Sequence, residues 1–397
     1  MKITMKSILT PARTHMVMNI LTAFALLAPA SAFAAGEVCT TIFGATDSQG
    51  VQLKIDGTWR KYDGSLFMAF RANAPHFWNW LRDNQIPLLQ PRGTVTGDPH
   101  IQNFGDVALK DGGRKYALID VDDSGMNAPL AGDFLRYFVG NQISPFKVDA
   151  KDLFKAYVDG VSGKKMDKPD YLKQVEDKSD KDFADRQLKR ISKLSNGRNF
   201  SPDAEVTPIP NTSAEIRALY EQVLPAFQNE MTGYEILDVG YRTKDSGGSQ
   251  GLPRFWFLLE KKGERHVFEF KMETDPATAL YTHQPDALTR FKNIADTYRP
   301  SQEVLGPYKF LQIGDKVFLL RERLYSYVNL DPALMTADKD KKDAQEMSLY
   351  IANKMGLAHG QQQMGGELKK RLEADGAYDS FTSLAVQYIT NISKANQ

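Results

Sequence analysis

The chain has 397 residues, 42% hydrophobic and 25% charged, which supplies apolar material for one large or two modest cores and lacks the compositional bias of disorder. Its 50 Lys and Arg stand against 49 Asp and Glu, so no basic excess exists to bind nucleic acid through its phosphates. The single cysteine, Cys39, excludes an internal disulfide, so the fold depends on its core.

The first 34 residues predict a cleaved secretory signal. Three basic residues precede the apolar run "MVMNILTAFALLAPASAFA", which ends with Ala32 and Ala34 in the A-x-A arrangement. A membrane anchor is the alternative, but a spanning helix needs about 20 apolar residues and Pro29 interrupts this run. Removal of the segment takes three of the 50 basic residues, so 47 oppose 49 acids. We therefore expect a periplasmic or secreted protein with no permanent membrane span and no nucleic-acid partner.

The segment from Arg60 to Leu89 predicts a helix with one apolar face. The face consists of Phe67, Phe70, Phe77, Trp78 and Leu81. Arg71 interrupts it, either as a surface residue whose stem lies on apolar side chains or as a charge directed into a site. Spacing alone favours the surface position, because long basic side chains commonly cover apolar surface.

A dense polar motif follows at residues 96–106, "TGDPHIQNFGD", with Asp98, His100 and Asn103. After it, two apolar runs, residues 107–109 and 116–121, flank "DGG", which is the composition of a tight hairpin. A hairpin brings its two ends together. We therefore expect the motif to lie near the acids at the end of the second run and just after it, Asp120, Asp122 and Asp123.

The next segments predict helices. "PLAGDFLRYFVGNQI" has apolar residues at helical spacing and Asp133 near its start, where a carboxylate is favoured. Residues 164–198 are rich in Lys and Asp and predict solvated helices with a loop. Residues 342–397 predict a helical tail that carries His359, which at such a position is more often a core residue than a ligand.

A small antiparallel sheet is predicted between these helical regions. Strand-like runs in residues 234–274 surround a glycine cluster at Gly247, Gly248 and Gly251, and one of them carries Lys271. A helix from Asp286 to Tyr298 and strands at residues 308–313 and 317–320 follow. The order is that of a sheet with one crossing helix.

Together these pieces match what phosphoryl transfer requires: a carboxylate for the acceptor, oxygen ligands for Mg²⁺, a lysine for the phosphates and a backbone cradle. Asp98 and Asn103 have the spacing of a kinase-type catalytic base and its magnesium-binding asparagine. Asp120 would bridge metal and phosphates, and Lys271 would bind the nucleotide. His100 more often supports such a loop than binds metal, because Mg²⁺ prefers oxygen ligands.

Two segments, "GDPHIQNFG" and "ALIDVDDSG", resemble the catalytic and metal loops of aminoglycoside phosphotransferase-like kinases. More closely, the chain resembles an uncharacterised bacterial family, domain of unknown function 2252. The matching blocks span residues 66–360 in the family's order: "LFMAFRA", "TGDPHIQNFG", "LIDVDDSG", "GDFLRY", "GGSQG", "EFKMET", "VFLLRERL" and "GLAHG".

This resemblance implies a set of site residues and cofactors. The catalytic residues would be Asp98 and His100, and Asn103, Asp120 and Asp122 would hold Mg²⁺ or Mn²⁺. ATP or another nucleoside triphosphate would contact Lys271, Gly247, Gly248, Ser249, Gly251 and Arg321. Support would come from Asp133, as an anchor beneath the catalytic loop, and from Arg71 and His359. The acceptor is unidentified.

The chain departs from the pattern at the crossing helix. The glutamate expected there as the partner of Lys271 is not evident, and Asn293 stands near its place. We therefore expect Lys271 to be held differently, by Glu273 or by an acid elsewhere.

The catalytic loop precedes the glycine turn and lysine, the reverse of ordinary kinases. The resemblance therefore implies an α+β, protein-kinase-like two-lobe fold that is circularly permuted. We expect a signal at 1–34, a lead-in at 35–59, a helical lobe at 60–204, a sheet lobe at 205–330, and C-terminal helices on the helical lobe at 331–397.

Three functions are open from the sequence. The first is an exported phosphotransferase or nucleotidyl transferase that uses Mg²⁺ and a nucleoside triphosphate. The second is a non-catalytic ligand-binding protein on the same scaffold. The third is a metal-dependent hydrolase in which Asp98, His100, Asp120 and Asp122 hold a transition metal.

Overall fold

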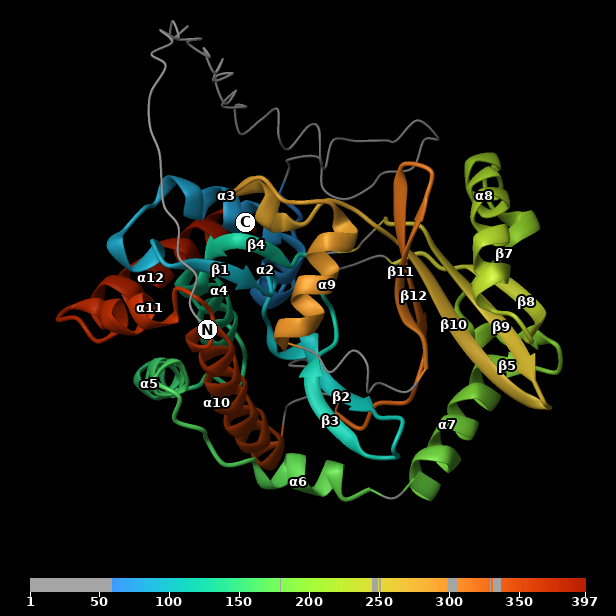
Figure 1. The fold of residues 1–397 in the computed structure, drawn as a ribbon, viewed down its shortest axis with the longest axis horizontal. Coiled ribbons are helices and arrows are strands. Elements are labelled where there is room, and N and C mark those ends of the chain that lie inside the picture. The colour runs from blue at the N-terminus through green and yellow to red at the C-terminus, as the bar shows by residue number, and fades with distance from the viewer. Residues whose placement is uncertain are drawn as a thin grey trace, which may run out of the picture. The chain divides into compact units, whose positions relative to one another are not determined.

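A computed structural model describes residues 59–178, 180–244, 249, 251–298, 306–328, 330 and 337–397 (Figure 1). The predicted signal and Cys39 lie outside these residues. Within them, no helix is both long and apolar enough to cross a membrane. The described part mixes helices with antiparallel sheets, so the α+β class is confirmed.

Eleven α-helices lie in the described residues: α2 (Leu66–Ala72), α3 (Ala74–Asp83), α4 (Leu130–Gln142), α5 (Ala150–Val161), α6 (Asp170–Glu176), α7 (Asp180–Leu194), α8 (Ala214–Glu230), α9 (Ala287–Tyr298), α10 (Asp338–Gly360), α11 (Gly365–Leu372) and α12 (Ala377–Ala395). The strands are β1 (Arg92–Val95), β2 (Phe104–Ala108), β3 (Arg114–Leu118), β4 (Gly125–Pro129), β5 (Ser195–Asn196), β6 (Asn199–Phe200), β7 (Thr207–Pro208), β8 (Glu235–Tyr241), β9 (Arg254–Lys261), β10 (Glu264–Glu273), β11 (Tyr308–Ile313) and β12 (Lys316–Glu322).

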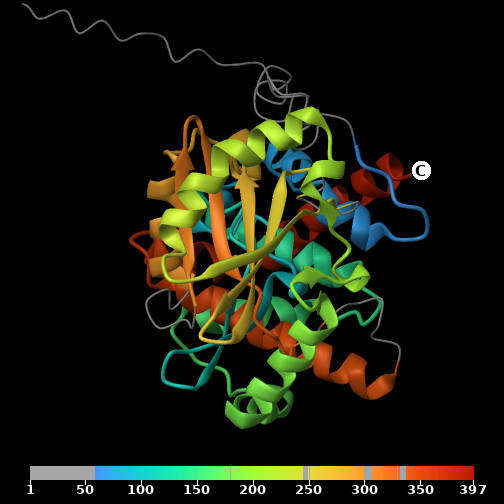
Figure 2. The ribbon, with the colours of Figure 1, turned by 90° about the vertical axis from the view of Figure 1, so that its right-hand side faces the viewer.

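The predicted sheet is confirmed as six antiparallel strands in the order β11-β12-β10-β9-β8-β7. Helix α8 covers one face of it (Figure 2). Side chains alternate between the two faces of a strand. In β10, Phe268, Phe270 and Met272 therefore pack in the core beneath α8, and Glu269 and Lys271 lie on the opposite face.

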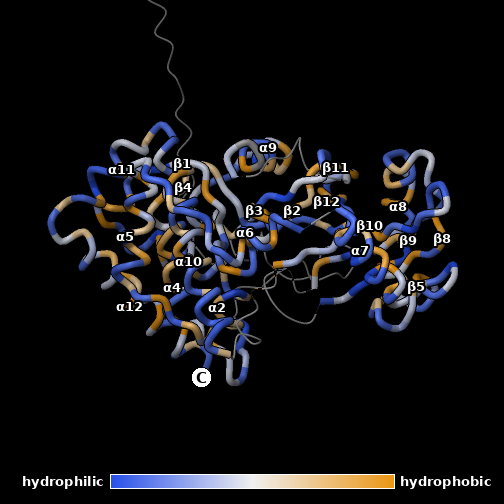
Figure 3. Tube along the Cα trace, turned by 90° about the horizontal axis from the view of Figure 1, so that it is seen from below, coloured by the Kyte–Doolittle hydropathy of each residue, from blue (hydrophilic) through white to orange (hydrophobic). Residues whose placement is uncertain are grey.

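A second, larger core lies among the helices. Helix α4 is almost wholly buried there, with α5, α10 and α12 packed around it. Figure 3 shows hydrophobic segments both among these helices and in the sheet beside α8. The hairpin β2–β3 and helix α9 lie between the helices and the sheet in Figure 1.

The prediction of one helix over Arg60–Leu89 is wrong in part. Two helices form, α2 and α3, and they are separated at Asn73. The break has a local cause, Pro75 at the start of α3. Proline has no backbone N–H to donate to the preceding turn, so α2 cannot continue through it, but proline is well accommodated in the first turn of a new helix. The predicted apolar face is buried as expected. The pairing of β1 with β4 and the helix α8 were not predicted.

Candidate functional site

The predicted hairpin is confirmed: β2 and β3 pair antiparallel from Phe104↔Leu118 to Ala108↔Arg114. Its open ends meet as expected, because residues from both flanks line one small polar cleft. The cleft, called here the acidic cleft, is lined by Arg71, Thr96, Asp98, His100, Asn103, Asp120, Asp122, Asp123, Lys244 and Ser249. Its volume of about 20 Å³ suits an ion or a water more than an organic ligand.

Asp98 is a buried carboxylate fixed by an arginine. Its Oδ1 accepts a hydrogen bond from Nε of Arg136 in α4 at 2.7 Å and lies in an ion pair 2.6 Å from Nη2 of the same arginine. Burial is the largest influence and raises the pKa of Asp98 to about 6, although Arg136 opposes the rise and Asp123 adds to it. The side chain of Asn103 donates to the Asp98 backbone carbonyl at 2.8 Å, which leaves the amide oxygen of Asn103 as an acceptor beside the cleft.

Arg71 is directed into the site, so the surface position that its spacing favoured is wrong. Its Nε donates to Nε2 of His100 at 3.2 Å. Burial, followed by the charges of Arg71 and Arg136, holds the pKa of His100 well below its usual range. His100 is therefore neutral, and its Nε2 lone pair is engaged by Arg71.

Asp133 lies beneath the motif and ties it to α4. Its carboxylate accepts the backbone N–H groups of Thr96 and Gly97, both at 2.9 Å. Gly97 has φ +82°, and a Cβ there would lie 1.7 Å from the Asp123 carbonyl oxygen, so only glycine fits this turn. His359 is buried below, with Nε2 3.4 Å from Asp133 Oδ2. These contacts fix the start of the motif from the core side.

Lys271 reaches from the sheet to the acids after the hairpin. Its Nζ donates to Asp122 Oδ2 and lies 3.1 Å from Glu273 Oε1 and 4.0 Å from Asp120 Oδ1. The expectation that Glu273 holds Lys271 is met, with Asp122 as a second acid. Among the side chains of the crossing helix α9 that the structure describes, none is acidic, and Asn293 donates a hydrogen bond to the Thr289 carbonyl of its own helix.

The charges of this group oppose one another. Burial acts most strongly and alone would lower the pKa of Lys271, but Asp122, Glu273 and Asp120 outweigh it and raise the pKa. Burial would raise the pKa of Asp120, yet Lys271 turns the net shift downward. The pKa of Asp122 is raised by burial and by the charge of Asp120, and that of Glu273 by burial and Asp122. The carboxyl groups of Asp120, Asp122 and Glu273 therefore all lie close to the single ammonium group of Lys271.

Some of these carboxylate oxygens lack hydrogen bonds. Within the described part of the chain, Oδ1 of Asp120 and Oδ1 of Asp122 are buried without a hydrogen-bond partner. In the same part, no three His, Cys, Asp or Glu side chains are grouped so as to hold a metal ion by themselves. A hard cation bound here would need further oxygens from a ligand or water.

Arg321 was predicted to contact the nucleotide, and it pairs with Glu269. Its Nη2 lies 2.6 Å from Glu269 Oε1, and Arg254 and Trp256 contact the other oxygen at 3.5 and 3.0 Å. Burial would raise the pKa of Glu269, but the guanidinium groups outweigh it and lower the pKa well below its usual range. Arg321 also lines a cavity of about 220 Å³ next to Ile119, the residue before Asp120.

The glycine turn is described only in part. Gly247 and Gly248 lie outside the described residues. Ser249 lines the cleft, and its Oγ is 3.3 Å from Lys244 Nζ and 3.1 Å from Arg254 Nη2. Gly251 has φ +81°, a conformation that favours glycine.

Three cationic residues of the site were missed from the sequence: Arg136, Lys244 and Arg290. Arg290 is buried in α9 and donates to the backbone carbonyls of Asp122 and Ser124, at 2.9 and 3.0 Å. Burial, followed by the charge of Arg254, lowers the pKa of Lys244 to about 8. The sequence places Arg136 three residues after Asp133 on the same helix, which could have marked it as a site residue. No local pattern, however, indicates that its partner is Asp98.

The comparisons with known proteins concern the second part of the chain. A profile of the family described as "Uncharacterized protein conserved in bacteria (DUF2252)" matches residues 145–397, which include Lys244, Lys271 and His359 but not the motif at residues 96–106. No curated protein and no solved structure matches the chain. Because the matched residues make up more than half of its length, the chain belongs to the DUF2252 family.

Proposed function

We propose that the protein is a kinase-like phosphotransferase that uses Mg²⁺ and a nucleoside triphosphate, with its motifs in circularly permuted order. The observation that carries the proposal is the convergence of distant segments: Lys271 Nζ lies 4.0 Å from Asp120 Oδ1, and Asp120 lines one cleft with Asp98 and Asn103. These are the base, metal ligands and phosphate-binding lysine that phosphoryl transfer requires.

The residues present fit a magnesium ion whose coordination shell is completed by oxygens of the substrate. Mg²⁺ in such sites is held by one or two carboxylates and by substrate phosphates, not by an all-protein cage. The unpartnered buried oxygens of Asp120 and Asp122, with the amide oxygen of Asn103, are ligands of this kind. When bound, the ion would neutralise phosphate charge.

The chain's own groups have distinct roles in this proposal. Asp98, whose Oδ1 is held by Arg136, would accept a proton from the acceptor hydroxyl at Oδ2. Lys271 would exchange its contact with Asp122 for the phosphates. Arg71 and Lys244, the cations that line the same cleft, would stabilise charge on the transferred group.

The nucleotide base would occupy the neighbouring cavity of about 220 Å³. Val107 and Ile119 contribute apolar surface from the hairpin side, and Tyr308 with Arg321 lines it from the sheet side. Aromatic and guanidinium groups provide stacking surfaces for a base. Since Ile119 adjoins Asp120, a base there would direct its phosphates toward the acidic cleft.

The other two functions differ in specific ways. A hydrolase with a transition metal on His100 is disfavoured because no group of three or more ligating His, Cys, Asp or Glu side chains occurs in the described residues. A ligand-binding protein without turnover would have the same cleft, and only a catalytic assay separates it.

A melting-temperature screen tests the proposal. The full chain would be heated with ATP, GTP or pyrophosphate, each with and without Mg²⁺. A ligand at about 100 times its Kd adds about 2.7 kcal/mol to the free energy of unfolding, so Tm should rise with nucleotide and Mg²⁺ together. Lys271→Met should lose the rise. No shift with any donor would overturn the proposal, and a shift without product formation would select the non-catalytic alternative.

A further inference from the structure

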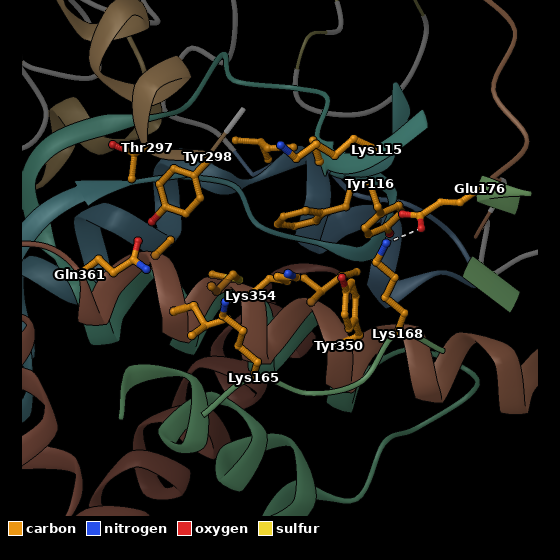
Figure 4. A pocket seen from close by; sticks show the side chains of 17 residues that line it. Lys115, Tyr116, Lys165, Lys168, Glu176, Thr297, Tyr298, Tyr350, Lys354 and Gln361 are labelled. Atoms are coloured by element: carbon orange, nitrogen blue, oxygen red, sulfur yellow. Dashed lines mark hydrogen bonds and ion pairs between the residues drawn. The ribbon is translucent and has the colours of Figure 1, made fainter. Parts of the chain in front are cut away.

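A large cavity lies apart from the acidic cleft. Its volume is about 600 Å³, within the range of small-molecule sites, and it shares no lining residue with the cleft. Figure 4 shows its walls: strand β3 with Lys115 and Tyr116 on one side, helix α10 with Tyr350 and Lys354 opposite, and Tyr298 of α9 at one end. Nothing in the proposed phosphotransfer uses this cavity.

The cavity carries a marked positive charge. The residues that line it include four lysines, Lys115, Lys165, Lys168 and Lys354, and a single acid, Glu176. Glu176 pairs with Lys168, so the lining has a net charge of +3, from four lysines and one glutamate. Burial and the charges of Lys165 and Lys168 lower the pKa of Lys354. Ammonium groups held together in this way favour a bound anion.

The remaining lining is aromatic and apolar. Tyr350 and Met355 of α10 are buried, and Phe104 and Tyr116 come from the hairpin. The hydroxyl of Tyr116 is buried, and in the described part of the chain it has no hydrogen-bond partner. A buried hydroxyl without a partner is costly, so a ligand that supplies one would be stabilised.

We propose that this cavity binds a small organic polyanion, with an apolar body against the tyrosines and several phosphate, sulfate or carboxylate groups on the lysines. Inorganic anions alone would leave the aromatic walls uncovered, and a neutral ligand would leave the net positive charge of the lining unbalanced. The inference is independent of the proposed phosphotransferase activity, since it uses none of those residues. Strand β3 forms one wall and leads directly to Asp120, so the ligand would contact the element that positions the acidic cleft.

Binding of methoxypyrene trisulfonate, a fluorescent aromatic polyanion, tests the proposal by fluorescence anisotropy on the full chain. We expect saturable binding with one site. Lys165→Gln/Lys354→Gln should raise Kd at least about tenfold, because charge-assisted hydrogen bonds are lost. Lys165→Arg/Lys354→Arg keeps the charges and should bind within about twofold of the natural chain.

Two controls make the result decisive. Lys370→Gln/Lys394→Gln removes two exposed lysines on other helices and should leave Kd unchanged. The neutral dye N-phenylnaphthylamine should bind the natural chain and the Lys165→Gln/Lys354→Gln variant alike. The proposal is overturned by non-saturable binding of the trisulfonate, by an unchanged Kd in Lys165→Gln/Lys354→Gln, or by an equal loss in both double glutamine variants.

Discussion

Asp98 shows how one side chain combines burial with a fixed partner. The bond from Arg136 holds one carboxylate oxygen, and burial raises the pKa to about 6. A base with such a pKa is mostly deprotonated at neutral pH and is still basic enough to accept a proton. Lys244, across the same cleft, has its pKa lowered to about 8 by burial and by Arg254.

These two groups predict a bell-shaped pH dependence. In the proposed phosphotransferase, Asp98 can accept a proton only above its pKa, so kcat/KM should rise through about pH 6. Lys244 loses its charge above about pH 8, so kcat/KM should fall there. Lys244→Arg keeps a cation at all these pH values and should remove the alkaline limb. Persistence of that limb in Lys244→Arg would refute its assignment to Lys244.

Substitutions of Asp98 and Asp120, which flank the hairpin, should affect different steps, the first catalysis and the second nucleotide binding. Asp98→Asn should lower kcat by about 10²- to 10⁴-fold, because the base is lost, while nucleotide affinity is retained. Asp120→Asn should weaken binding of the magnesium nucleotide itself, since a buried carboxylate oxygen is removed. Titration calorimetry with a non-hydrolysable nucleotide checks this. Equal loss of affinity in both variants would contradict the separate roles.

At the scale of elements, close packing of α5 against α10 supports the cleft from below, because α10 carries His359 toward Asp133. Glycines permit this approach. A Cβ on Gly356 of α10 would lie 2.2 Å from the Tyr157 carbonyl oxygen, and one on Gly160 of α5 would lie 2.2 Å from that of Asn353.

Gly356→Ala should therefore reduce the free energy of unfolding by about 1–3 kcal/mol, because the helices must separate. Gly366→Ala is the matched control. It lies in α11 with nothing within 4 Å of its Cβ position, so helix propensity alone should stabilise it by about 0.5–1 kcal/mol. Urea unfolding of both variants measures the difference, and equal values would rule out the steric explanation.

At the scale of the whole molecule, the acidic cleft exists only because the sheet and the helical region meet. Lys271 and Asp122 are 149 positions apart, and the Arg290 bond to the Asp122 carbonyl spans 168. Neither region alone contains both the lysine and the acids. A ligand bound in the acidic cleft should therefore change amide exchange both in the helical region and in the sheet.

Hydrogen exchange with mass spectrometry measures this coupling. A magnesium nucleotide should slow amide exchange in the motif at residues 96–106 and also in β10 around Lys271, because one ligand contacts both. The distal hairpin β5–β6 should show no change. Slower exchange confined to the motif or to β10 would place the nucleotide elsewhere.

The sequence by itself determined the local elements and the candidates within them. The strand-like runs at 308–313 and 317–320 on either side of a Gly-Asp turn, the helical spacing in 130–143 and the "DGG" turn are short-range patterns. The strands, the helix and the hairpin could therefore be predicted. The hairpin pattern is also sufficient to predict that Asp98 lies near Asp120, because the two residues flank its open end. The helical spacing of apolar residues did not predict the break between α2 and α3 at Asn73, just before Pro75.

Only the tertiary structure decided which polar side chains pair. Arg71 with His100, Arg136 with Asp98, and Lys271 with Asp122 join segments remote in sequence, and no local pattern specifies a partner across such distances. Burial decided the rest, since desolvation sets whether a carboxyl or an amine is charged, and desolvation depends on what packs around it.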